Sequence, residues 1–74
     1  MSEEILVRRD GGGFIEFCNK RLGPDDWSYW ILEKDVSTHE TLLKWIEHME
    51  EKNWITADHI QQLSDIYFEI QSIK

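Results

Sequence analysis

With 74 residues, 41% of them hydrophobic, the chain is too apolar for a disordered tail and long enough for one small core. Its single cysteine excludes an intrachain disulfide, and no apolar run approaches the roughly 20 residues of a transmembrane helix. The start also lacks the apolar centre of a signal peptide. We therefore expect a cytoplasmic protein, or one released into a host cytoplasm.

The formal net charge of −7 is unevenly distributed along the chain. Residues 1–21 hold four basic and four acidic groups, whereas residues 22–74 hold four basic and eleven acidic groups. A field of this sign opposes direct binding to nucleic-acid phosphates and suits a basic partner surface. Moderate negative charge also keeps a small domain in solution, so a role in solubility alone stays open.

Three short strands are expected in the first half of the chain. Two apolar runs, 4–9 and 14–18, flank an Asp-Gly-Gly-Gly turn, which is a hairpin signal. The glycine cluster lacks the Lys-Ser/Thr ending of a phosphate-binding loop, and no helix pattern follows it. After a turn at Pro24, the run 27–34 predicts a third strand with apolar residues on both faces. Such a strand is either covered twice or keeps one face for a partner.

A first helix is expected from Ser37, because Ser37 and Glu40 match a capping box. Asn53 is expected to end it in the left-handed conformation. The predicted apolar stripe comprises Leu42, Ile46 and Met49, flanked by Leu43 and Trp45, and the opposite, solvated stripe comprises Glu40, Lys44, Glu47 and Glu51.

A second helix is expected from the N-cap Thr56 to about Ile73, with Asp58 in its first turn. Phe68 lies roughly 150° from the apolar stripe, among polar side chains. It is either covered by the N-terminal strand or the chain end, an ordinary exposed residue, or an aromatic anchor for a partner. The predicted core stripe comprises Ile60, Leu63, Ile66, Tyr67, Ile70 and Ile73.

The order of elements predicts one α+β domain spanning residues 1–74. We expect a three-stranded antiparallel sheet followed by two helices packed on one face, in the order β-β-β-α-α. The other face of the sheet is then open to solvent, to a partner or to a second copy.

No constellation of catalytic or metal-binding residues stands out. The histidines His39, His48 and His59 lack the spacing of a zinc site, and Cys18 on an apolar strand reads as a small core side chain. We expect no enzyme activity, no cofactor and no metal.

The leading hypothesis is a small acidic inhibitor that blocks a basic, nucleic-acid-binding surface of a larger protein by imitating phosphate charge. Phage anti-defence proteins, including anti-CRISPRs, share this physical style, and so do nuclease-toxin immunity proteins; the link is an analogy of class, without a shared motif. The expected partner-binding residues are Asp58, Gln61, Asp65, Phe68 and Glu69, extended by Glu40, Glu47 and Glu51.

Two other binding functions remain open. A structural or regulatory subunit, including a homodimer, would use an apolar sheet face that carries Trp27, Tyr29 and Trp30. A single-strand nucleic-acid platform would combine those aromatic residues with a basic cluster, although matching acids in the same segment argue against it. That cluster would comprise Arg8, Arg9, Lys20 and Arg21.

Overall fold

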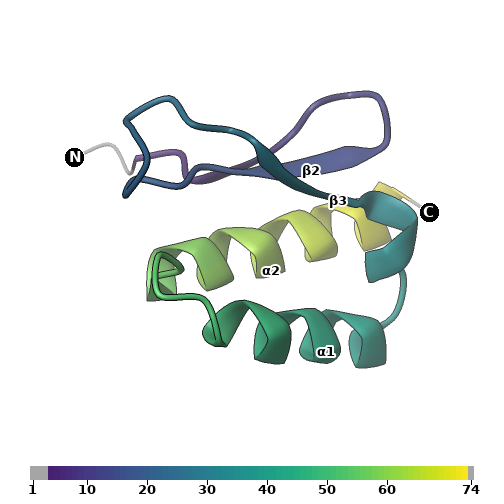
Figure 1. The fold of residues 1–74 in the computed structure, drawn as a ribbon. Helices are drawn as coiled ribbons and strands as arrows, with labels where there is room; N and C mark the ends of the chain where they lie inside the picture. Colours follow the sequence, from purple (N-terminus) through teal and green to yellow (C-terminus); the bar gives the residue numbers. More distant parts are fainter. Residues whose placement is uncertain (1–3, 74) are drawn as a thin grey trace.

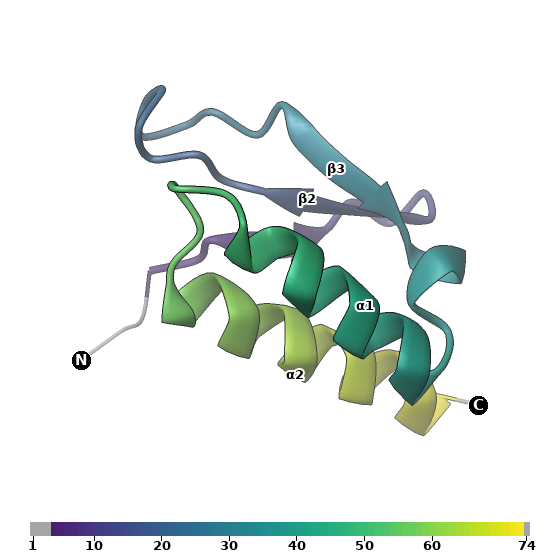
Figure 2. The ribbon, with the colours of Figure 1, turned by 60° about the horizontal axis from the view of Figure 1, so that its bottom comes forward.

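The computed structural model describes residues 4–73 and has the predicted α+β architecture (Figure 1). Three antiparallel strands in the order β1-β2-β3 form a sheet, and both helices lie on one of its faces (Figures 1 and 2). A short 3-10 helix, η1, joins the sheet to the helical layer. The elements are β1 (Val7–Arg9), β2 (Phe14–Phe17), β3 (Tyr29–Leu32), η1 (Glu33–Val36), α1 (His39–Glu50) and α2 (Ala57–Ile73).

The predicted hairpin is confirmed as β1 and β2. Gly11 and Gly13 have φ values of 85° and 97°, in the region that side chains disfavour, so glycine suits both positions. The Asp10 carboxylate closes the turn by accepting hydrogen bonds from the backbone N–H groups of Gly12 at 2.7 Å and Phe14 at 3.0 Å. Local turn chemistry therefore sets the register of this pair.

The third strand is shorter than the predicted run 27–34. Before it, the backbone N–H of Ser28 donates to the Asp26 carboxylate at 3.2 Å, which holds that residue in a turn. After it, the chain turns into η1 at Glu33. Only Tyr29–Leu32 pairs with β2.

The predicted N-cap of the first helix is wrong by one residue. Thr38 is the cap: its hydroxyl accepts from the Thr41 N–H at 3.2 Å, and the Thr41 hydroxyl accepts from the Thr38 N–H at 3.1 Å. Ser37 is already helical in backbone conformation, because it ends η1, and its carbonyl accepts from the Gln71 side chain. The capping box is thus present with Thr41, not Glu40, as its second member.

The predicted end of this helix at Asn53 is also wrong. Helix α1 ends at Glu50 with Glu51 as its C-cap, and only glycines among the described residues have positive φ. The cap N–H of Glu51 reaches back to the carbonyls of His48 and Met49, so a left-handed residue is not needed. Thr56 does act as expected before α2, since its hydroxyl accepts from the His59 N–H at 3.4 Å.

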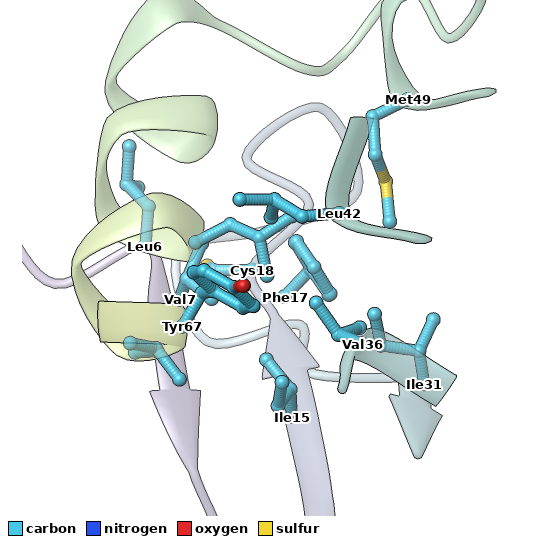
Figure 3. Close-up of a cluster of buried hydrophobic side chains, with 12 residues drawn as sticks. Leu6, Val7, Ile15, Phe17, Cys18, Ile31, Val36, Leu42, Met49 and Tyr67 are labelled. Atoms are coloured by element: carbon cyan, nitrogen blue, oxygen red, sulfur yellow. The ribbon is translucent and has the colours of Figure 1, made fainter. Parts of the chain in front are cut away.

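The core lies between the sheet and the helical layer (Figure 3). Alternate residues of β2, Ile15 and Phe17, point inward and are almost fully buried, as the period of a strand requires. The helices contribute the central residues of their apolar stripes, while the side chain of Ile73 lies outside the described residues. Trp54 and Ile55 pack against the core from the connection. The buried apolar residues are Leu6, Val7, Ile15, Phe17, Cys18, Ile31, Val36, Leu42, Met49, Leu63, Ile66 and Tyr67.

Candidate protein-binding surface

One exposed stripe of α2 contains all five residues expected to bind a partner on that helix. They project away from the buried stripe that includes Leu63 and Ile66. Within it, the Gln61 side-chain amide donates to the Asp65 carboxylate at 3.0 Å, one turn along the helix. The stripe comprises Asp58, Gln61, Asp65, Phe68 and Glu69, and we call it the α2 stripe.

Phe68 is the apolar centre of the α2 stripe. Its side chain remains 60% exposed, with one edge contact to Tyr67 at 5.4 Å between ring centroids. Neither the N-terminal strand nor any other described segment buries it. An exposed phenyl ring among carboxylates offers a partner both apolar area and charge.

The carboxylates of the α2 stripe differ in whether they form ion pairs within the protein. Glu69 accepts from Arg9 at 3.4 Å, and Arg9 also pairs with Glu33 through two contacts of 3.0 and 3.1 Å. The hydrogen bonds that Arg9 donates to Glu33, together with the negative charges of Glu33 and Glu69, raise the pKa of the Arg9 guanidinium above its usual value. Asp58 and Asp65, by contrast, form no ion pair with residues 4–73, so they are free to meet a cation of a partner.

A second carboxylate stripe runs along α1. Glu40, Glu47 and Glu51 are exposed on the side opposite the buried Leu42 and Met49, as predicted. Both acidic stripes therefore belong to the helical layer, which lies away from the outer face of the sheet (Figure 2).

Only one of these three glutamates takes part in a described ion pair. Glu40 pairs with Lys44 at 3.5 Å, and both side chains are largely exposed, so the pair contributes little to stability. Glu47 and Glu51 have no such partner among residues 4–73.

The basic residues of the N-terminal segment are largely neutralised by neighbouring acids. Arg8 pairs with Glu16 at 2.9 Å and Lys20 pairs with Glu4 at 2.8 Å, in addition to the Arg9 contacts. Of the four bases once considered for nucleic-acid phosphates, three are therefore already in ion pairs. The remaining net field is negative.

The outer face of the sheet carries an aromatic and charged cluster. Phe14 and Trp30 meet edge to face at 4.8 Å, and the Arg8 guanidinium lies 3.9 Å from the centroid of Trp27. Because the Arg8–Glu16 ion pair crosses the same face, this surface is not a continuous apolar patch.

Tyr29 does not lie on that outer face, which corrects the sequence-based expectation. It is paired with the inward-facing Phe17, and its ring packs against Phe17 at 5.6 Å and Trp54 at 5.5 Å. Burial raises the pKa of the Tyr29 phenol above its ordinary value. Strand alternation in the sequence does not show which side of the run 27–34 faces the core. The pairing of Tyr29 with Phe17 of β2 places Tyr29 on the inner face.

His59 is a buried polar residue that sequence analysis missed. Its ring nitrogen Nε2 lies 2.8 Å from the Cys18 carbonyl oxygen and Nδ1 lies 3.0 Å from the Thr56 backbone nitrogen. The contact with Cys18 is to the backbone and not to the thiol. The one available signal was its position among Ile60, Leu63 and Ile66 on the helix, beside the predicted apolar stripe.

Within residues 4–73 no cluster of three or more His, Cys, Asp or Glu side chains has a geometry suited to a metal ion. None of the helices in this range is long and apolar enough to cross a membrane. No family model, curated protein or solved structure matches the chain.

Proposed function

We propose that this protein is a small inhibitor that binds a basic, nucleic-acid-binding surface of a larger protein through its helical layer. The α2 stripe is the centre of the proposed contact, and Glu40, Glu47 and Glu51 extend it. By analogy of size and charge alone, the phage anti-defence class, including anti-CRISPR proteins, fits this proposal. A nuclease-toxin immunity role is the second member of the same physical class.

The observation that supports this proposal is a set of exposed carboxylates that form no ion pair with residues 4–73. Asp58, Asp65, Glu47 and Glu51 form no ion pair with the described residues, whereas three of the four N-terminal bases do. A surface with unpaired charge of one sign steers an oppositely charged partner during encounter. Phe68 adds the desolvated apolar contact that charge alone does not supply.

The first experiment uses affinity capture from the native host lysate at low and high salt. A charge-dependent partner should be retained at low salt and released at high salt, because the screening length is about 8 Å at physiological ionic strength and shrinks as salt rises. The captured protein is then purified and tested for loss of nucleic-acid binding when this protein is added. A partner held equally tightly at all salt concentrations contradicts charge mimicry.

A charge-reversal variant tests the α2 stripe directly against that purified partner. Asp58→Lys with Asp65→Lys should weaken association by at least about tenfold, since each reversal replaces an attraction by a repulsion. Asp25→Lys is the matched control, because Asp25 is an exposed carboxylate in the loop before β3 and outside both stripes. If Asp25→Lys weakens binding as much as Asp65→Lys alone, net charge and not the α2 stripe controls association.

The alternative of a structural subunit that binds through the outer sheet face has weaker support. Trp30 and Phe14 offer aromatic area there, but the Arg8–Glu16 pair would have to be desolvated on binding. This alternative predicts binding that does not depend on salt. The salt series above therefore distinguishes the two proposals.

A further inference from the structure

The two edges of the sheet differ in whether their outward backbone groups are hydrogen-bonded. At the β1 edge, the Gln62 side chain of α2 accepts from the N–H groups of Leu6 at 2.7 Å and Val7 at 2.9 Å, and donates to the Glu4 carbonyl at 2.7 Å. A side chain thus occupies the positions that another strand would use. The start of the β1 edge, at Leu6 and Val7, is thereby covered by the protein's own helix.

The β3 edge is open. The Glu33 N–H donates to the Gly13 carbonyl, so in the alternating antiparallel ladder Tyr29 and Ile31 also direct their backbone groups toward β2. Trp30, between them, must direct its N–H and C=O away from β2, toward the free edge of the sheet. Leu32 likewise directs its N–H toward this edge. No described side chain hydrogen-bonds to these groups.

The sequence of β3 also lacks the usual protection of a free edge. Natural edge strands carry charges, proline or bulges that discourage pairing with another chain. Tyr29–Leu32 reads Tyr-Trp-Ile-Leu, without any of these, whereas β1 has two arginines. Trp30 at this edge is 53% exposed. An unprotected edge opposite a protected one indicates that β3 has a partner strand.

The surface beside η1, which directly follows β3 in the chain, has charges of both signs. A pocket of about 260 Å³ lies along α1 beside η1, where the Trp45 indole donates to the Asp35 carbonyl at 3.2 Å. Its lining includes the acidic Asp35 and the basic Lys44. On this surface an acidic group of one copy can therefore face a basic group of another about a two-fold axis, whereas the α2 stripe has no basic group.

We propose that β3 pairs antiparallel with β3 of a second copy of this chain, which makes a six-stranded sheet about a two-fold axis. Pairing about a two-fold axis uses the β3 edge of both copies, so it closes at the dimer and does not continue into a fibre. The proposal does not rest on the inhibitory function, because it is argued from the backbone edge of β3 and not from the acidic stripes.

The first test is the mass in solution by sedimentation equilibrium from about 1 to 500 μM protein. We expect the mass to approach twice 8.9 kDa as concentration rises. Salt should strengthen the dimer, because it screens repulsion between two copies that each carry a net charge of −7. This salt effect is opposite in sign to that expected for the inhibited partner, so the two proposals fail separately. A monomer at every concentration and salt level overturns the dimer and leaves an extended segment of another protein as the occupant.

A proline variant tests the edge itself. Leu32 has φ −84° and directs its N–H outward, so Leu32→Pro should remove an edge donor without breaking the ladder with β2. We expect the dissociation constant of the dimer to rise at least about tenfold, because the substitution removes one donor from each of the two copies. Leu32→Ala is the matched control, because it shortens the same side chain and keeps the N–H. If the alanine variant loses the dimer as fully as the proline variant, the edge hydrogen bonds are not responsible.

Hydrogen exchange on the unmodified protein keeps the test valid even if the proline variant fails to fold. The amides of Trp30 and Leu32 should exchange more slowly as concentration rises, whereas the exposed amides of the loop 19–26 should not change. A dimer without added protection at these two amides would be formed by another surface, and edge pairing would be wrong.

Discussion

His59 is held by two backbone groups from segments that are far apart in the sequence. The Cys18 carbonyl can only accept, so the Nε2 atom at 2.8 Å must donate to it, and Nδ1 then accepts from the Thr56 N–H. The neutral imidazole with its proton on Nε2 satisfies both contacts. A residue 41 positions away in sequence is thereby connected to the start of α2.

His59→Ala should lower the free energy of unfolding by about 2–4 kcal/mol, because it leaves a cavity and two backbone groups without their partner. For a domain of 74 residues this is a large fraction of the roughly 4–11 kcal/mol expected in total. Urea denaturation measures the change. His48→Ala, at an exposed helix position, is the control and should cost less than about 1 kcal/mol.

Tyr29 gives the protein an alkaline sensitivity. Since burial raises its pKa in the folded state, the folded protein holds the phenol proton more tightly than the unfolded chain does. This contribution to stability is fully present below about pH 10, the ordinary tyrosine value, and is lost as pH rises through the folded-state pKa. Thermal unfolding measured from pH 8 to 11 should therefore show stability falling above pH 10, and Tyr29→Phe should reduce that fall. An equally steep fall in the phenylalanine variant would assign it to other groups.

At the scale of elements, the capping of α1 depends on which of two adjacent hydroxyl residues reaches the helix N-terminus. Thr38 makes the reciprocal contacts with Thr41, while Ser37 makes no side-chain hydrogen bond with the described residues. Thr38→Ala should therefore destabilise the protein by about 1 kcal/mol, and Ser37→Ala should be close to neutral. Urea denaturation of the two variants measures this directly; equal effects would mean that the cap is shared.

The helices were predictable from sequence because their signals are local. Leu42 and Met49 share one face of a 3.6-residue period, and both are buried as expected. The cap was misassigned by one residue because Ser37 and Thr38 are both competent, and the 3-10 helix that occupies Ser37 has no clear sequence signal.

Contacts between distant segments were not predictable in this way. The inward orientation of Tyr29 depends on its register with Phe17, the covered start of the β1 edge depends on Gln62, and the burial of His59 depends on Cys18. No periodic pattern in a single sequence encodes these pairings. For the candidate site, the exposure of the α2 stripe followed from the helical period, but the ion pair between Glu69 and Arg9 did not.

At the scale of the whole molecule, most ion pairs lie at the sheet, whereas a group of carboxylates without ion pairs lies on the helices. The contacts of Arg8, Arg9 and Lys20 lie on or beside the sheet, while Glu47, Glu51, Asp58 and Asp65 lie on the outer sides of the helices. The unpaired charges repel one another and oppose the compact state. The same carboxylates that are proposed to attract a partner therefore reduce the stability of the free protein.

This arrangement predicts that salt stabilises the isolated monomer. Raising NaCl from about 20 to 300 mM shortens the screening length several-fold and weakens the repulsion between the carboxylates. The melting temperature should therefore rise, because the exposed ion pairs contribute little stability that salt could remove. Glu47→Lys with Asp65→Lys changes the net charge from −7 to −3, since each substitution removes one negative charge and adds one positive charge; neither position lies in the first turn of its helix. The double variant should melt at a higher temperature than the parent at low salt and respond less to added salt. Calorimetry at concentrations below self-association measures both effects, and a melting temperature that falls with salt would mean that the ion pairs of the sheet outweigh the repulsion between the helices.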